Sequence, residues 1–373
     1  MRKIIAIALA AGMIATATAS ACELCGPAAA RRGSLAFEFD QAGVILYGKL
    51  ANPKLNAKGA GTTEFHVDAV IKDDPAFPRQ KVLMLPRYLP ILDDKNPPKY
   101  VMFFRSAKES REPYWGKEIA NPKVLEFVAE LYRYRDNPAQ RLLKAAERFA
   151  DADPVIADEA FMVFAKATDK LVAEVAPKLD PAMLRALVKN PDLEPERVSL
   201  FAYLLGACGN ERDADLLAAI LKNAASRDFK AFEGILAGYI SLRPKEGWTF
   251  TLDTLANPKQ SFLLRYASMR TMRFYYNARP AESESHVMRG MSLALNHVDI
   301  ADIAIEDLRK WKRWDHTKLI LGCWDKASHQ SEITRQSIVR YAFACPLPDA
   351  KTFLDRARKQ APEIVSDIEA ESK

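Results

Sequence analysis

The hydrophobic pattern of the chain changes its period near residue 120. Before that point, short runs alternate between apolar and polar residues, as in 62–72 (TTEFHVDAVIK), and a period of two is typical of β-strands. Beyond it, amphipathic stretches of about 10–16 residues predict helices. Many of these stretches open with Pro directly after Asp or Asn, as in 137–138 and 153–154, which is the usual composition of a helix start.

The region 35–118 is predicted to hold roughly four to six short strands. Leu35, Phe37 and Phe39 alternate with polar neighbours, so the first strand is expected to begin there. The further candidates are 62–72, 81–85 and 100–104, separated by turn-rich segments at 73–75 and 93–98. Strands of this number and length favour a small antiparallel barrel or sandwich.

This region resembles the OB barrel of netrin modules and of tissue inhibitors of metalloproteinases. Three runs carry the resemblance, 44–50 (VILYGKL), 65–72 (FHVDAVIK) and 100–104 (YVMFF), together with a Cys at the expected mature N-terminus. The resemblance implies a barrel and an inhibitor that reaches a protease zinc through Cys22. That family bonds its N-terminal cysteines to cysteines of the barrel, whereas 35–118 contains none, which counts against inhibitor activity.

The helical part of the chain repeats itself. When Arg197, Arg265 and Arg335 are aligned, a small residue follows two positions later and an apolar residue four positions later in each copy. Intermediate copies complete a series with intervals of 33–39 residues, at Asp158, Arg197, Phe232, Arg265, Asp302 and Arg335. A helix pair of this length cannot bury both of its faces alone, so copies stack, and small residues let neighbouring helices approach closely.

The aligned segments 264–267 (LRYA) and 334–337 (TRQS) resemble the second half of HEAT repeats. This resemblance implies a right-handed α-solenoid of HEAT-like helix pairs over 119–373, with about fourteen helices. The arrangement of the whole chain also resembles a family of uncharacterised exported proteins of planctomycete-type bacteria, through 302–311 (DIAIEDLRKW) and 340–342 (RYA). That family implies no activity.

Residues 1–21 have the layout of a signal peptide. Arg2 and Lys3 precede an apolar run over 4–17, and Ala-Ser-Ala at 19–21 places small residues at positions −3 and −1 of a cleavage site. The run is shorter than the ~20 apolar residues of a membrane span, and no later segment is long and apolar enough. We therefore expect export to the periplasm, the extracellular space or the cell envelope.

The expected organisation is a signal peptide (1–21), a flexible Cys-containing arm (22–34), the β domain (35–118) and the solenoid (119–373). The net charge of +6 becomes near +4 when Arg2 and Lys3 are removed (6 − 2). A mildly basic exported chain favours neither nucleic acid nor an anionic membrane as its partner.

Cys22 and Cys25 form the sharpest local motif, Cys-Glu-Leu-Cys-Gly. Gly26 stands where c-type haem attachment needs His, and no further zinc ligands lie nearby. The pair could form a disulfide, Cys22 could carry a lipid after cleavage at Ala21, or the thiols could stay free. Three other cysteines lie near the ends of apolar helices and are expected to be packing residues: Cys208, Cys323 and Cys345.

The sequence offers no catalytic constellation. It lacks a phosphate-binding loop, a nucleophile elbow and a His-Glu-x-x-His motif, and its five histidines do not form metal-spaced pairs. We therefore predict a protein that is not an enzyme and that uses no cofactor or metal.

The segment 308–316 (LRKWKRWDH) mixes basic and aromatic residues, a composition found on recognition surfaces. The expected recognition residues on the solenoid are Arg265, Arg270, Arg273, Arg309, Trp311 and Trp314. We expect an exported, non-catalytic binding or scaffold protein with a protein or peptide partner and not a nucleic acid. The alternatives are a secreted metalloprotease-inhibitor-like protein acting through Cys22 and a structural envelope lipoprotein anchored there.

The intact mass of the native protein, recovered without reducing agent, tests the export prediction. We expect the mass of a chain that starts at Cys22, less two hydrogen atoms if Cys22 and Cys25 are bonded to each other. A diacylglyceryl adduct would identify a lipoprotein. The mass of the uncut chain would contradict export.

Overall fold

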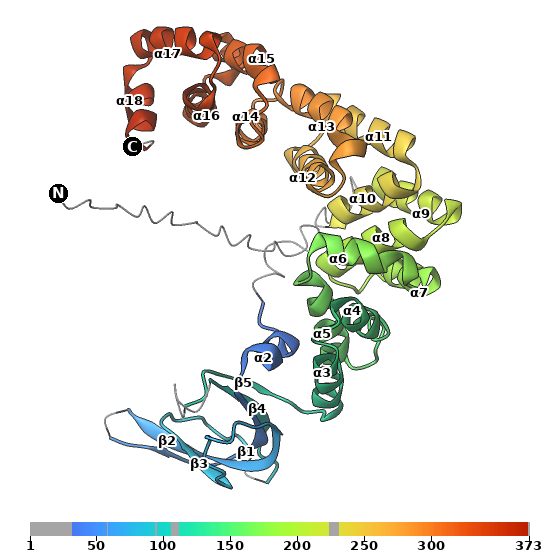
Figure 1. Cartoon of the computed structure of the whole chain (residues 1–373), viewed down its shortest axis with the longest axis vertical. Coiled ribbons are helices and arrows are strands. Elements are labelled where there is room, and N and C mark those ends of the chain that lie inside the picture. The colour runs from blue at the N-terminus through green and yellow to red at the C-terminus, as the bar shows by residue number, and fades with distance from the viewer. Residues whose placement is uncertain (1–31, 58, 94, 106–111, 224–230, 372–373) are drawn as a thin grey trace, which may run out of the picture.

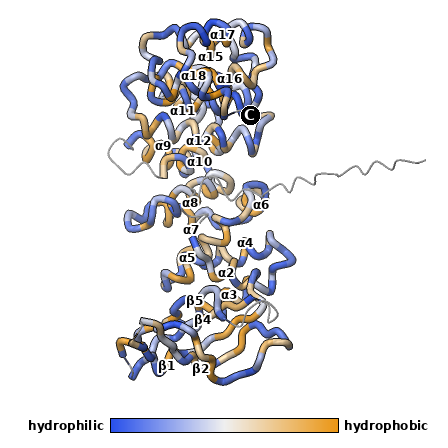
Figure 2. Tube along the Cα trace, turned by 90° about the vertical axis from the view of Figure 1, so that its left-hand side faces the viewer, coloured by the Kyte–Doolittle hydropathy of each residue, from blue (hydrophilic) through white to orange (hydrophobic). Residues whose placement is uncertain are grey.

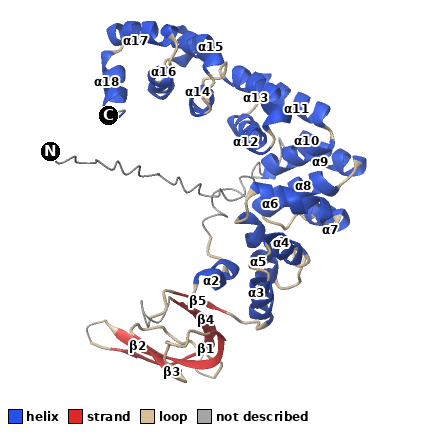
Figure 3. Ribbon diagram, viewed as in Figure 1, coloured by secondary structure: helices blue, strands red, loops and turns tan. Residues whose placement is uncertain are grey.

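The computed structural model describes residues 32–57, 59–93, 95–105, 112–223 and 231–371. A sheet stands at one end of a curved array of helices, and the helices follow the chain in order around the arc (Figure 1; Figure 3). Seen from the side, the molecule is a narrow column with the sheet at its foot (Figure 2). The predicted signal peptide, Cys22 and Cys25 lie outside the described residues.

The first described element is a helix, α2 (Leu35–Gln41), where the alternating pattern predicted a strand. That prediction was wrong. The Ser34 hydroxyl caps the helix by accepting a hydrogen bond from the Phe37 backbone N–H (3.4 Å). Leu35 and Phe39 are buried, whereas Phe37 is 44% exposed. Over five residues, the spacing i, i+4 of one helix face also satisfies a period of two, so the alternation did not distinguish the two structures.

Five strands form one antiparallel sheet in the order β3-β2-β1-β4-β5. They are β1 (Val44–Leu55), β2 (Gly61–Lys72), β3 (Val82–Leu85), β4 (Lys99–Phe104) and β5 (Trp115–Glu118). Among the described strands, β3 and β5 are edges that do not pair with each other, so the expected barrel or sandwich is replaced by an open sheet. Both edge strands have only four residues, and β2, β1 and β4 lie between them.

Sixteen described α-helices follow the sheet, slightly more than expected from the sequence. They are α3 (Lys123–Arg133), α4 (Pro138–Ala146), α5 (Pro154–Ala165), α6 (Asp169–Val175), α7 (Pro181–Lys189), α8 (Pro195–Cys208), α9 (Glu211–Lys222), α10 (Phe232–Leu242), α11 (Pro244–Ala256), α12 (Phe262–Ala278), α13 (Pro280–Ala294), α14 (Ala301–Lys310), α15 (Thr317–Gly322), α16 (Glu332–Ala344), α17 (Pro348–Gln360) and α18 (Pro362–Glu371). Pro opens many of them after a capping residue, as Asn137 and Asp153 do for α4 and α5, which confirms the predicted helix starts.

The central strands of the sheet are buried on both faces. Ile45 and Phe103 share a core with α2 and α3 on one face. On the other face, Phe104 packs beneath the loop that carries Phe77, with ring centroids 5.1 Å apart. This double burial explains why β1 and β4 read as continuous apolar runs and not as an alternation.

The helices form two layers around the arc. Contacts run along an inner row, from α8 to α10 to α12 and from α14 to α16 to α18, and along an outer row, between α11 and α13 and between α15 and α17. Figure 1 shows α12, α14 and α16 on the inner side of the curve and α13, α15 and α17 on the outer side. The array is therefore solenoid-like.

The six aligned repeat positions all fall in helices of one kind, α5, α8, α10, α12, α14 and α16. The small residues that follow them permit close contact between α8 and α10. The Gly234 backbone N–H donates to the Ser199 hydroxyl (3.1 Å), and a Cβ on Gly206 would lie 2.4 Å from the Gly238 Cα. The expected role of small residues is confirmed at this crossing.

A buried carboxylate joins the start of α2 to the helical array. Glu159, fully buried on α5, accepts hydrogen bonds from the Ser34 hydroxyl (3.0 Å) and from the backbone N–H groups of Leu35 (3.0 Å) and Ala36 (3.2 Å). The Lys117 ammonium of β5 lies 3.5 Å from the same carboxylate. Glu159 therefore holds the start of α2 and the last strand at one point on α5.

Arg141 of α4 holds the other end of α2. Its guanidinium donates to the Asp40 carboxylate (2.7 Å) and to the Ala36 carbonyl oxygen (3.1 Å). Between these two attachments, the Phe39 ring packs edge-on against Phe103 of the sheet, with centroids 5.9 Å apart. Sheet, α2 and helices therefore share one continuous core.

The Glu159→Gln substitution tests this attachment. The amide turns a pair of donor hydrogens toward backbone N–H groups, so we expect a loss of about 2–4 kcal/mol of unfolding free energy, measured by urea titration. The matched control is Asp158→Asn on the same helix, whose partner Arg32 is half-exposed, and it should cost less than about 1 kcal/mol. Equal effects of both substitutions would contradict the role of Glu159.

Candidate functional site

The predicted recognition residue Arg265 is buried. Its guanidinium donates to the Gln260 carbonyl oxygen (2.5 Å) and to the carboxylate of Asp299, in the connection between α13 and α14. Arg197, at the equivalent position of α8, likewise donates to a carbonyl of a preceding connection, that of Phe149 (3.2 Å). At these two positions the repeated arginine thus links its helix to connections between other helices.

Arg270 and Arg273 lie on α12 between two buried carboxylates. Arg270 forms an ion pair with Glu233 of α10 (2.9 Å), and Arg273 forms one with Asp307 of α14 (2.6 Å). We call these four residues the charged row. The row bridges three neighbouring inner helices, so both arginines already have carboxylate partners within the chain.

Burial changes the proton affinity of the carboxylates in the charged row. Desolvation raises the pKa of Glu233 to about 7, although Arg270 and Arg273 pull it down. Desolvation also raises the pKa of Asp307, again against the attraction of Arg273. Glu233 is only 7% exposed, which explains why loss of hydration outweighs its two cationic neighbours.

The other three predicted recognition residues lie in and after α14. Arg309 pairs with Glu306 on its own helix (2.8 Å). Trp311 stacks on Tyr276 of α12, with centroids 4.1 Å apart. Trp314 packs edge-on against Tyr341 of α16 at 5.3 Å. The structure thus gathers all six predicted residues around α12 and α14 and gives each an internal contact, while their role in binding a partner stays a prediction.

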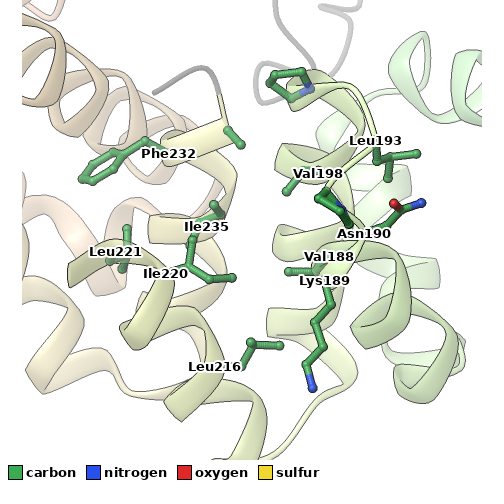
Figure 4. Close-up of a pocket in the computed structure, with 13 residues that line it drawn as sticks. Val188, Lys189, Asn190, Leu193, Val198, Leu216, Ile220, Leu221, Phe232 and Ile235 are labelled. Carbon is green, nitrogen blue, oxygen red and sulfur yellow. The ribbon is translucent and has the colours of Figure 1, made fainter. Parts of the chain in front are cut away.

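The structure also shows a groove that the sequence did not reveal. The groove encloses about 610 Å³, and eleven of its thirteen lining residues are apolar. Val198 of α8 lies on one side of it, and Phe232 and Ile235 of α10 lie on the other. Leu193, before α8, and Ile220, on α9, stand on opposite sides (Figure 4). We call it the α8–α10 groove.

The geometry of the groove follows from the packing of α8 against α10. Because α8 and α10 meet through glycines, they lie close together, and α7 and α9 stand apart on either side of them. The buried Asp213 carboxylate of α9 accepts hydrogen bonds from Arg185 of α7 (2.5 and 3.0 Å), which links the two walls. Lys189 supplies the sole charge among the lining residues.

Sequence reasoning missed the groove because its residues have ordinary core spacing. Leu216, Ile220 and Leu221 continue the apolar stripe of α9, as they would if they packed against a neighbouring helix. Whether a side chain of such a stripe meets a neighbour or open space depends on the separation of α7 and α9. That separation depends on tertiary packing, and no local signal encodes it.

The thiols and acidic groups of the described residues show no reactive arrangement. Burial raises the pKa of Cys208 to about 11 and also raises that of Cys323, so these thiols resist ionisation. Within the described ranges, no group of three or more His, Cys, Asp or Glu side chains is placed to hold a metal ion. Of the helices described, none has the length and apolarity to cross a membrane.

The charged row predicts how stability depends on pH. Glu233 holds its proton in the folded chain up to about pH 7 but releases it near its ordinary value of 4.5 when unfolded. At this site the folded state then binds more protons, so the contribution of Glu233 to the unfolding free energy should fall as pH rises from 4.5 to 7, by on the order of 2 kcal/mol.

Urea titrations across this pH range measure the slope. Glu233→Gln should remove the falling contribution of this residue from the slope, because the amide does not titrate, whereas Glu363→Gln on the exposed side of α18 should leave the slope unchanged. A slope that survives Glu233→Gln intact would contradict the assignment.

No family model, curated protein or solved structure matches the chain.

Proposed function

We propose that this chain is an exported, non-catalytic binding or scaffold protein that holds an apolar peptide segment of a protein partner on a HEAT-like α-solenoid. The α8–α10 groove carries the proposal. It presents buried and half-buried apolar side chains around about 610 Å³ of space, within the ~300–1,000 Å³ typical of ligand sites. Filling such a site removes apolar surface from water and therefore favours binding.

The shape of the groove favours a peptide anchored by a few large apolar side chains. Its lining comes from two neighbours in the repeat series, through Val198 of α8 and Ile235 of α10, and from α7 and α9 beside them. An amphipathic segment with anchors three or four residues apart matches a groove of this kind. Lys189 at the rim adds a preference for a nearby acidic residue on the partner.

A binding role also agrees with the polar groups around the groove. Lys189 and Asn190 are the two polar residues among those lining it, and a single amine with one amide does not make a nucleophile, an acid and a base. The register of repeat positions through α5 to α16 supports a HEAT-like solenoid, a fold that generally supplies extended binding surfaces.

Selection from a library of random 16-residue peptides against the mature chain tests the proposal. We expect enrichment of peptides with large apolar residues three or four positions apart. Ile220→Lys places a charge on the half-buried wall of the groove and should weaken binding of the selected peptides by at least about tenfold in fluorescence anisotropy. Lys189→Glu should weaken peptides that carry an acidic residue beside their anchors.

The matched control is Leu319→Lys, which replaces a leucine that is 56% exposed on α15 and should leave binding unchanged. Circular dichroism should show the same helix content for all variants. Selected peptides that bind native chain and Ile220→Lys alike would overturn the proposal, as would a failure to enrich any apolar pattern.

A further inference from the structure

Strand β3 is an open edge of the sheet. It is the last strand in the spatial order, and it pairs with β2 in the register Phe65 to Leu83 and His66 to Val82. The Val67 N–H donates to the Lys81 carbonyl oxygen (2.9 Å), which identifies 67 and 81 as a hydrogen-bonded pair. Since such pairs alternate along an antiparallel ladder, Leu83 also bonds toward β2.

The same alternation turns the backbone groups of Val82 and Met84 away from β2. Among the described residues, no backbone hydrogen bond outside the sheet reaches either of them. Their side chains are exposed as well, Val82 by 42% and Met84 by 58%, on the face that carries the Glu64–His66 pair. Two alternate positions on one edge thus combine outward N–H and C=O groups with exposed apolar side chains.

The charged residues of the segment that contains β3 are all basic. No acidic residue occurs between Pro75 and Leu92, whereas Arg79, Lys81 and Arg87 lie close to the strand and are exposed. Arg79 pairs with Asp73 (2.7 Å). Lys81 and Arg87 make no ion pair with a described residue.

This charge disfavours a second copy of the chain as the occupant of the edge. A two-fold pairing that matches Val82 with Met84 sets Arg79 of one copy against Arg87 of the other. A pairing of Met84 with Met84 sets Lys81 against Arg87. Like charges directly opposite each other destabilise a strand pair, so these two registers are disfavoured, whereas a partner with acidic residues is favoured.

We propose that β3 is a docking edge for an extended acidic segment of a partner polypeptide, which adds to the sheet as a sixth strand. Backbone hydrogen bonds at Val82 and Met84 would hold the segment, its apolar residues would cover these two side chains, and Lys81 and Arg87 would attract acidic residues on either side. This site is separate from the α8–α10 groove.

Two labelled peptides test the charge preference. They share the core Thr-Val-Thr-Val-Thr, and one carries Glu and the other Lys at both ends. We expect the acidic probe to bind the mature chain at least about tenfold more tightly in fluorescence anisotropy at low salt. The double substitution of Lys81→Glu and Arg87→Glu should invert the preference. Equal binding of the two probes would overturn the proposal.

Met84→Pro tests the edge itself. Proline removes the outward N–H of residue 84 but spares the ladder to β2, so the sheet should persist while the acidic probe no longer binds. Met84→Thr keeps the N–H and should retain most of the binding. If Met84→Pro lowers the thermal unfolding midpoint sharply, the charge-inverted variant, whose backbone is unchanged, decides the question.

Undiminished binding of the acidic probe to folded Met84→Pro would overturn the assignment to β3. Sedimentation velocity tests whether a second copy of this chain occupies the edge instead. If the native chain is a dimer and Met84→Pro is a monomer, the edge pairs with a second copy of this chain, and the proposal is overturned. A native monomer that binds the acidic probe supports the proposal.

Discussion

The carboxylate of Glu159 is buried away from water, and its hydrogen-bond donors come from residues more than a hundred positions earlier in the chain. Burying a charge in this way costs several kcal/mol unless donors surround it. The first turn of α2 provides them from Ser34 and Leu35, while Arg141 holds the other end of the helix. Together with Arg141 and the shared apolar core, this contact fixes α2 between the sheet and the helices.

Charge and apolar surface have different roles along the arc. Arg270 and Arg273 of the charged row and the buried Arg265 are bonded to groups within the chain, and these contacts tie consecutive inner helices together. Apolar surface is left open where α7 and α9 stand apart above the tight α8–α10 crossing. The proposed function therefore assigns recognition to side chains that resemble core residues, while the conspicuous arginines hold the scaffold.

The two proposed sites lie in different parts of the molecule and select different partners. The α8–α10 groove offers apolar space beside one lysine, whereas β3 offers backbone groups beside Lys81 and Arg87. A chain that binds one segment on its helices and another on its sheet can bring two polypeptides together. The shared core running from α2 through the helical array would hold the two sites in a constant relation.

Periodicity in the sequence determined the order of strands before helices, the helix starts at Pro138 and Pro154, and the repeat positions that recur on α8, α12 and α16, because these features depend on residues close together in the chain. Tertiary structure decided the rest. The pattern at Leu35 to Phe39 fits a helix or a strand locally, and contact with Glu159 favours the helix. Three further features depend on distances between elements far apart in sequence, which no local pattern encodes. They are the open form of the sheet, the internal pairing of Arg270 and Arg273, and the opening of the groove.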